Sequence, residues 1–209
     1  MNTIRKVLSN PKHIIFDLFE VQITGLRAVG EPLGRLVGLS RVDTLRSIWG
    51  NGGELQTFFR GKMSEEDCLR NIIHRNRWSV SVAEFKKLIR ENFVEVSGTE
   101  SLIERLKSRG YKLSILSVQS KEWDTHVSKN FGFKKHFDMQ SYSYEEGVTK
   151  PDVEAFRNHL RKIHSEPGDC LFIDDSVGNT KIADDVGMST INFRHAEHLE
   201  FELASRGIL

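Results

Sequence analysis

Five polar residues in this sequence stand where a sheet of parallel strands would bring them together. Asp17, Ser117 and the pair Asp174–Asp175 each close a short apolar run, and Lys150 stands in a turn directly before a proline. Carboxylates hold Mg²⁺ through oxygen ligands, while an ammonium and a hydroxyl bind the oxygens of a phosphate group. Asp17 could attack phosphorus and form an aspartyl-phosphate. The set therefore indicates phosphoryl transfer.

The elements that must position these residues alternate along the chain. Three short apolar runs read as strands buried on both faces, and they are His13–Phe19, Lys112–Ser117 and Asp169–Asp175. Helical patterns follow them at Glu100–Ser108, Asp152–His164 and Asn179–Val186. Alternation of this kind predicts an α/β fold, a Rossmann-like parallel sheet covered on both faces. Ligands of such sheets bind beyond the carboxyl ends of the strands, where the five polar residues are expected.

A different pattern fills the stretch between the first and second runs. It contains amphipathic segments and no convincing strand, and the segments are Gly53–Arg60, Ser64–Asn76 and Ser81–Asn92. Ser64 and Ser81 each precede an acidic residue by three positions, which is typical of a helix start. We therefore predict a small all-helical cap over residues 23–97, inserted after the first strand of a core formed by residues 1–22 and 98–209.

The composition argues against several kinds of binding partner and against a membrane protein. The 209 residues include 30 Lys+Arg and 29 Asp+Glu, a formal net charge of +1 that is spread along the chain, which argues against nucleic acid and anionic membranes as partners. No apolar run is long enough for a signal peptide or a membrane span, and the two cysteines form no framework. We expect a cytoplasmic globule, with no sequence signal for an oligomeric state.

The same residues carry a resemblance to a known family. Asp17, Ser117, Lys150 and Asp174–Asp175, the last followed by Asn179 and Gly187, resemble the four ordered motifs of the haloacid dehalogenase-like (HAD) hydrolase superfamily. The match covers roughly residues 14–193, and the position of the insertion is similar to that in members with a small helical cap. The segment from Phe59 to Ser64 resembles the cap of sugar-1-phosphatase-like members, such as the alpha-glucose-1-phosphatase-like ones.

This resemblance implies a function and a set of roles. It implies a Mg²⁺-dependent phosphatase that acts on a small phosphorylated metabolite, such as a sugar phosphate, through an aspartyl-phosphate. Mg²⁺ would be held by Asp17, by the backbone carbonyl of Phe19 and by Asp175, with Asp174 nearby. Ser117 and Lys150 would neutralise the transferring phosphoryl group.

Three residues depart from the family pattern. Phosphatases of the superfamily usually carry a second aspartate, the general acid and base, where this chain has Phe19. A positioned acid or base contributes about 10²–10⁴-fold in rate, so its loss should slow esters with poor leaving groups most. The glucose-1-phosphatase-like branch also lacks this aspartate. Val118 replaces a common asparagine, and Glu20 is an alternative, displaced proton donor.

Other interpretations stay open at this point. An aromatic residue at position 19 is similar to the true 2-haloacid dehalogenases, but those enzymes need no metal and carry Ser and Asn where this chain has Asp174 and Asp175. Phe19, Val118 and Glu20 depart from the family pattern together, which would also fit a catalytically degraded binding or regulatory protein with the same fold. Asn179 is either a site residue or a helix cap. Arg60 either contacts a second anionic group of the substrate or is simply exposed.

Aromatic residues are frequent in the predicted cap. Trp49, Phe58, Phe59, Trp78 and Phe85 have partly helical spacing, so we expect most of them to pack in a core. One or two are expected to line the substrate entrance.

Overall fold

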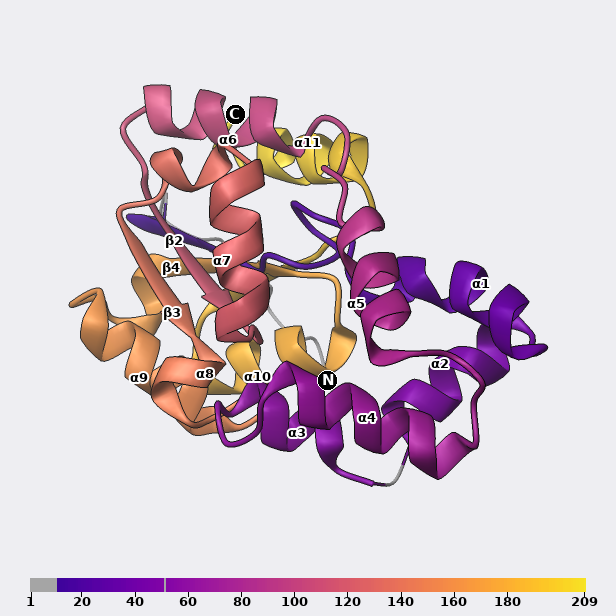
Figure 1. The fold of residues 1–209 in the computed structure, drawn as a ribbon. Helices are drawn as coiled ribbons and strands as arrows, with labels where there is room; N and C mark the ends of the chain where they lie inside the picture. The colour runs from indigo at the N-terminus through magenta and orange to yellow at the C-terminus, as the bar shows by residue number, and fades with distance from the viewer. Residues whose placement is uncertain (1–10, 51) are drawn as a thin grey trace, which may run out of the picture.

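The computed structural model describes residues 11–50 and 52–209, and its centre is a five-stranded parallel sheet in the order β3-β2-β1-β4-β5 (Figure 1). The strands are β1 (His13–Phe16), β2 (Lys112–Ser117), β3 (Met139–Tyr142), β4 (Cys170–Asp174) and β5 (Ser189–Asn192). Phe16 at the end of β1 is level with Ile115 and Ile173 in its two neighbours. The carboxyl ends of the three central strands therefore meet at one edge, and the predicted α/β class is confirmed.

Helices cover both faces of the sheet because successive residues of each strand point to opposite sides. The core helices are α6 (Thr99–Ser108), α7 (Lys121–Asn130), α8 (Ser143–Glu146), α9 (Val153–Lys162), α10 (Val177–Val186) and α11 (Ala196–Ser205), with two short 3₁₀ turns at Phe133–His136 and Pro167–Asp169. Ile14 and Phe16 pack in the cluster that contains residues of α6, α7 and α11, whereas Ile15 packs against Phe156 of α9 and Ala183 of α10. This alternation fixes which side of the sheet each helix covers.

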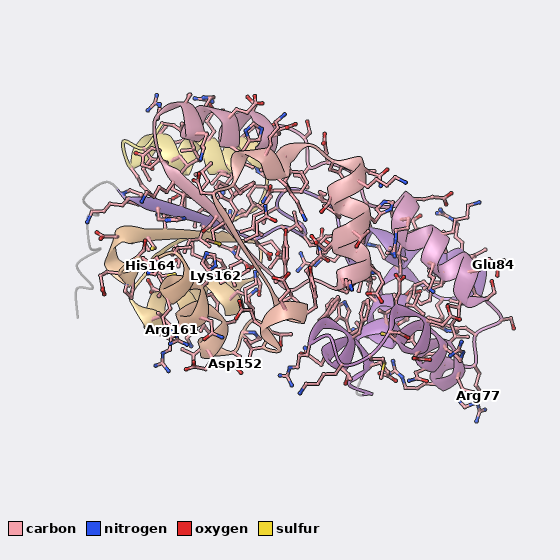
Figure 2. The ribbon with its side chains drawn as sticks, turned by 60° about the vertical axis from the view of Figure 1, so that its left-hand side comes forward. Arg77, Glu84, Asp152, Arg161, Lys162 and His164 are labelled. Atoms are coloured by element: carbon pink, nitrogen blue, oxygen red, sulfur yellow. The ribbon has the colours of Figure 1, made fainter. Side chains whose placement is uncertain are left out.

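The cap consists of five helices between β1 and α6. They are α1 (Leu26–Val37), α2 (Arg41–Trp49), α3 (Glu54–Phe59), α4 (Glu65–Asn76) and α5 (Val82–Glu91). Ser64 and Ser81 cap α4 and α5 as expected, each accepting a hydrogen bond from the backbone N–H three residues later. Figure 2 shows the sheet with its helices on one side and the cap on the other, with Arg77 and Glu84 at the far end of the cap.

Two of the cap helices, α1 and α2, were not among the segments predicted from the sequence. Helix α1 contains Pro32 and two glycines, which obscure its helical pattern. The glycines serve a close approach to α2, since a Cβ on Gly30 would lie 2.7 Å from Leu45 and one on Gly34 would lie 2.8 Å from Thr44 Oγ1. Small residues here allow the two helices to pack tightly.

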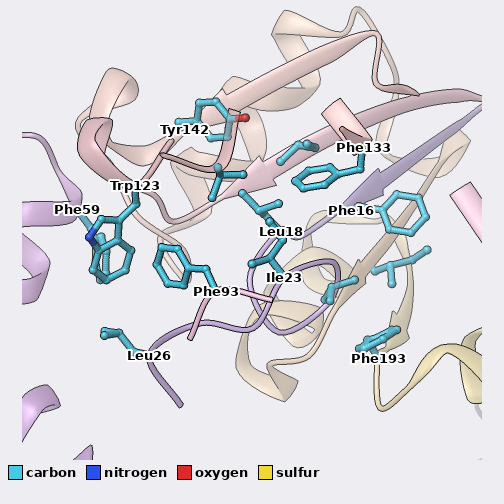
Figure 3. Packing of buried hydrophobic residues seen from close by; sticks show 14 of the residues in the cluster. Phe16, Leu18, Ile23, Leu26, Phe59, Phe93, Trp123, Phe133, Tyr142 and Phe193 are labelled. Atoms are coloured by element: carbon cyan, nitrogen blue, oxygen red, sulfur yellow. The ribbon is translucent and has the colours of Figure 1, made fainter. Parts of the chain in front are cut away.

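An aromatic cluster joins the cap to the core. Trp123 of α7 contacts Phe58, Phe59 and Phe93 edge-on, with ring centroids 5.3–5.5 Å apart, and Figure 3 shows Phe59, Trp123 and Phe93 side by side. The Trp123 indole N–H donates to Glu65 Oε1 at 2.6 Å. Phe58, Phe59 and Phe85 are buried as predicted, whereas Trp49 is 50% exposed and belongs to no core.

A second contact between cap and core involves main-chain atoms of the cap. Ser143 Oγ donates to the carbonyl oxygen of Phe59 at 2.7 Å. Gly61 lies so near α8 that a Cβ there would approach the Tyr144 carbonyl oxygen to 2.5 Å, and its φ of +70° also favours glycine. The cap is thus held over the carboxyl edge of the sheet. Among the described residues, no helix has both the length and the apolar content needed to cross a membrane.

Candidate active site

The predicted catalytic residues occupy the carboxyl edge of the three central strands. Asp17 directly follows β1, Ser117 is the last residue of β2, and Asp174 is the last residue of β4. The sheet fixes these positions: Ser117 and Asp174 are in register with Tyr142 and Asn192 of the neighbouring strands, and the backbone N–H of Asp17 donates to the carbonyl oxygen of Ile173 at 2.8 Å. Each of the three is buried.

Lys150 lies between two of the carboxylates. Its Nζ is 2.9 Å from Asp17 Oδ2 and 2.6 Å from Asp174 Oδ2, and its side chain is only 2% exposed. Burial alone would lower the pKa of Lys150, but the charges of Asp17 and Asp174 outweigh burial and raise it. Lys150 is therefore a fixed ammonium at the centre of the site.

Asp174 is held from three sides. Besides Lys150, its Oδ1 accepts from the backbone N–H of Ser176 at 2.8 Å, and both of its oxygens lie 3.1 Å from the side-chain nitrogen of Asn179. Ser176, not Asn179, is the N-cap of α10, so the alternative of Asn179 as a helix cap is wrong. Asn179 therefore contacts the site through Asp174.

Three carboxylates converge at this edge. One oxygen each of Asp17, Asp174 and Asp175 lies within 4.8 Å of the others. Burial raises the pKa of Asp17 to about 8, with Lys150 opposing and Asp174 and Asp175 adding to the rise. Three carboxylates in the cluster outnumber the single ammonium of Lys150. An oxygen-only donor set with excess negative charge fits a hard divalent cation such as Mg²⁺.

Asp175 has a partner that the sequence did not suggest. Arg27, in the first turn of α1 in the cap, places its NH1 2.5 Å from Asp175 Oδ2. Burial raises the pKa of Asp175, and the guanidinium of Arg27 opposes this shift. A basic residue at the start of a cap helix is too common a sequence feature to have identified Arg27.

Ser117 presents a free donor to the same edge. Its Oγ is buried and makes no hydrogen bond to any described residue. A buried hydroxyl without a partner costs free energy unless a ligand satisfies it. The hydroxyl therefore suits an oxygen of a bound phosphate group.

The remaining predicted residues lie at the margin of the site. Phe19 packs against Phe93 and Trp123, with ring centroids 5.1 and 5.8 Å away, so an apolar ring faces the cap where the family usually has its acid. Glu20 has a left-handed backbone (φ 63°), and its Oε1 accepts from the backbone N–H of Gly25 at 3.0 Å. Glu20 thus holds the turn into α1. Arg60 is exposed at the end of α3.

Comparison with known proteins places the chain in a family. Residues 11–187 match the model of the haloacid dehalogenase-like hydrolases, and the chain belongs to this family. A solved HAD family enzyme from Bacteroides thetaiotaomicron, in complex with magnesium and inorganic phosphate, superposes with a TM-score of 0.72 at 21% identity, covering 88% of this chain and 95% of that one. The L-2-haloacid dehalogenase of Xanthobacter autotrophicus also superposes, with a TM-score of 0.66 at 15% identity and coverages of 95% and 84%. These two likenesses show a shared fold.

Curated relatives include enzymes named for phosphorylated metabolites. Flavin mononucleotide hydrolase 1 of Arabidopsis thaliana, a chloroplast protein, is 25% identical over 151 residues, which are 72% of this chain and 61% of the relative. Glyceraldehyde 3-phosphate phosphatase of Pyrococcus furiosus is 26% identical over 113 residues, 52% of this chain and 46% of the relative. The chain therefore matches about half to three fifths of the length of these relatives.

Proposed function

We propose that this protein is a Mg²⁺-dependent phosphatase of small phosphorylated metabolites that works through an aspartyl-phosphate on Asp17. The observation that carries the proposal is the position of Lys150, buried between Asp17 and Asp174 beside a third carboxylate. A nucleophile, a cation for phosphate and a metal-binding cluster thereby share one edge of the sheet. The names of the relatives support a phosphorylated metabolite, and sugar phosphates are the class we favour.

In the proposed reaction, a carboxylate oxygen of Asp17 attacks phosphorus as the bond to the leaving-group oxygen breaks. Lys150 and the free hydroxyl of Ser117 bind the phosphoryl oxygens and offset their charge. Mg²⁺, held by Asp17, Asp175 and the Phe19 carbonyl with Asp174 nearby, would supply further charge stabilisation and orient the phosphate group. Water then attacks phosphorus and releases inorganic phosphate, which regenerates the Asp17 carboxylate.

The leaving group departs without the usual proton donor. Phe19 packs in the aromatic cluster, and the carboxylate of Glu20 accepts a backbone hydrogen bond at the start of the cap. We therefore propose that the protein favours esters whose leaving groups need little protonation, such as anomeric sugar phosphates and acyl phosphates. We also place the activity in the cytoplasm, since Cys68 and Cys170 are both free.

The test is phosphate release from a panel of sugar, acyl and alkyl phosphates, with Mg²⁺ and with EDTA. Turnover that requires Mg²⁺ and declines as the leaving group becomes more basic supports the proposal. A panel without turnover, together with untouched 2-haloacids, would favour a binding or regulatory protein on the same fold. Chloride release from a 2-haloacid in EDTA would instead identify a dehalogenase.

The position of Phe19 makes a gain of function testable. Phe19→Asp places a carboxyl group two residues after the nucleophile, where phosphatases of the superfamily usually carry their general acid. We expect turnover of alkyl phosphates to rise by about 10²-fold while that of acyl phosphates changes little, because only poor leaving groups need the proton. Phe19→Leu is the matched control for loss of the aromatic ring. Equal effects on both substrate classes would contradict a role for this position in proton transfer.

A further inference from the structure

One ion pair links the cap to the candidate metal site. Arg27 NH1 lies 2.5 Å from Asp175 Oδ2. The Asp175 side chain is 13% exposed and the Arg27 side chain 54% exposed. The carboxylate is thus fixed in the core, whereas the guanidinium reaches it from solvent and can leave without being buried elsewhere.

The backbone around Arg27 is positioned for this contact. Leu26 begins α1 directly after the turn at Gly25, whose backbone N–H donates to Glu20 Oε1. Glu20 follows Asp17 by three residues, so the nucleophile loop and the start of α1 are held together. The Arg27 guanidinium therefore lies near two carboxylates, those of Asp175 and Glu20: burial raises the pKa of both, and the charge of Arg27 opposes the rise.

The Arg27 contact and a divalent cation require the same group. Asp175 belongs to the three-carboxylate cluster, and its Oδ2 lies 2.5 Å from the Arg27 guanidinium. Mg²⁺ bound to the same carboxylate, at about the 2.0–2.1 Å typical of magnesium sites, would share its negative charge with the guanidinium. Positive charge near the oxygen also repels the incoming ion. Mg²⁺ and the Arg27 guanidinium therefore compete for the negative charge of Asp175.

We propose that Arg27 is an internal competitor of Mg²⁺ for Asp175, so that the first helix of the cap sets the affinity of the core for its metal. The inference rests on the proposed function, because it needs the carboxylate cluster to bind Mg²⁺. The ion pair between Arg27 and Asp175 joins α1 to the core. When Mg²⁺ takes Asp175, that connection between cap and core is released.

Calorimetric titration of Mg²⁺ into the full chain tests this proposal. Arg27→Met is expected to bind Mg²⁺ about three- to tenfold more tightly than the parent protein, the size expected when one ion pair no longer competes. Arg35→Met is the matched control, since Arg35 lies on the same helix and pairs with Glu31 at the surface. It should leave the Mg²⁺ affinity unchanged. Arg27→Lys, which keeps the charge, should fall between the two.

A second readout separates competition from a general effect of charge. In EDTA, Arg27→Met should lower the melting temperature, because the ion pair to Asp175 is lost; in saturating Mg²⁺ the two proteins should melt at the same temperature. Equal Mg²⁺ affinities of the parent and Arg27→Met would overturn the proposal alone. Mg²⁺ that binds neither protein, with Asp175→Asn behaving like both, would overturn the proposed metal site as well.

Discussion

Asp17→Asn is expected to reduce Mg²⁺-dependent phosphate release by at least about 10³-fold, because a side-chain amide cannot form the phosphorylated intermediate. The substitution preserves shape, and Lys150 keeps its 2.6 Å contact with Asp174. The variant should therefore fold. Phosphate release from the preferred substrate measures the loss, and denaturing electrophoresis after rapid acid quenching should show a labelled phosphoenzyme only in the parent protein.

The control for Asp17→Asn is the same change at an exposed position. Asp185 lies on the surface of α10, and Asp185→Asn should retain full activity. If Asp17→Asn kept its activity while remaining dependent on Mg²⁺, Asp17 would not be the nucleophile. If the variant lost its fold, near-ultraviolet circular dichroism would show it.

Lys150→Met is expected to lower the free energy of unfolding by about 3–5 kcal/mol, since it leaves two buried carboxylates without their cation. The side chains of Lys150 and Asp174 are 2% and 0% exposed, so water cannot replace the lost charge. Urea denaturation in EDTA measures the change. The variant should also lose phosphatase activity in Mg²⁺.

Two further variants identify the origin of this destabilisation. Lys86→Met removes an ammonium from the surface pair with Glu66 and should hardly change stability. The double variant Lys150→Met/Asp174→Asn removes one buried negative charge together with the positive one. It should be less destabilised than the sum of its two single variants, because the two sites interact directly. Additive effects would show that packing, not charge, explains the loss.

The central part of the fold could be predicted because burial on both faces leaves a plain signal. β1, β2 and β4 are the three middle strands, and their apolar runs in the sequence matched them closely. β3 and β5 are the edge strands and have the polar sequences Met-Gln-Ser-Tyr and Ser-Thr-Ile-Asn. Such strands form because they pair with a neighbouring strand, and the hydrophobic pattern of their own sequence does not reveal that pairing.

The residues of the candidate site also fall into those that the sequence could predict and those that it could not. Asp17, Ser117 and Asp174 could be placed at one edge because parallel strands carry their ends there. Lys150 is not on a strand, and its predicted role came from the proline turn and the family resemblance. Arg27 was missed because its contact with Asp175 depends on how the whole cap lies on the core, a tertiary fact that no local pattern encodes.

The cap is docked on α8 largely through main-chain atoms, the Phe59 carbonyl and the close approach of Gly61 to the Tyr144 carbonyl. This contact with α8 places few demands on the side chains of the cap. Cap residues outside it and outside the aromatic cluster around Trp123 are therefore free to diverge during evolution, and a new specificity can arise without a new way of attaching the cap. Position 61 is constrained, since any larger residue there would force the cap away from α8.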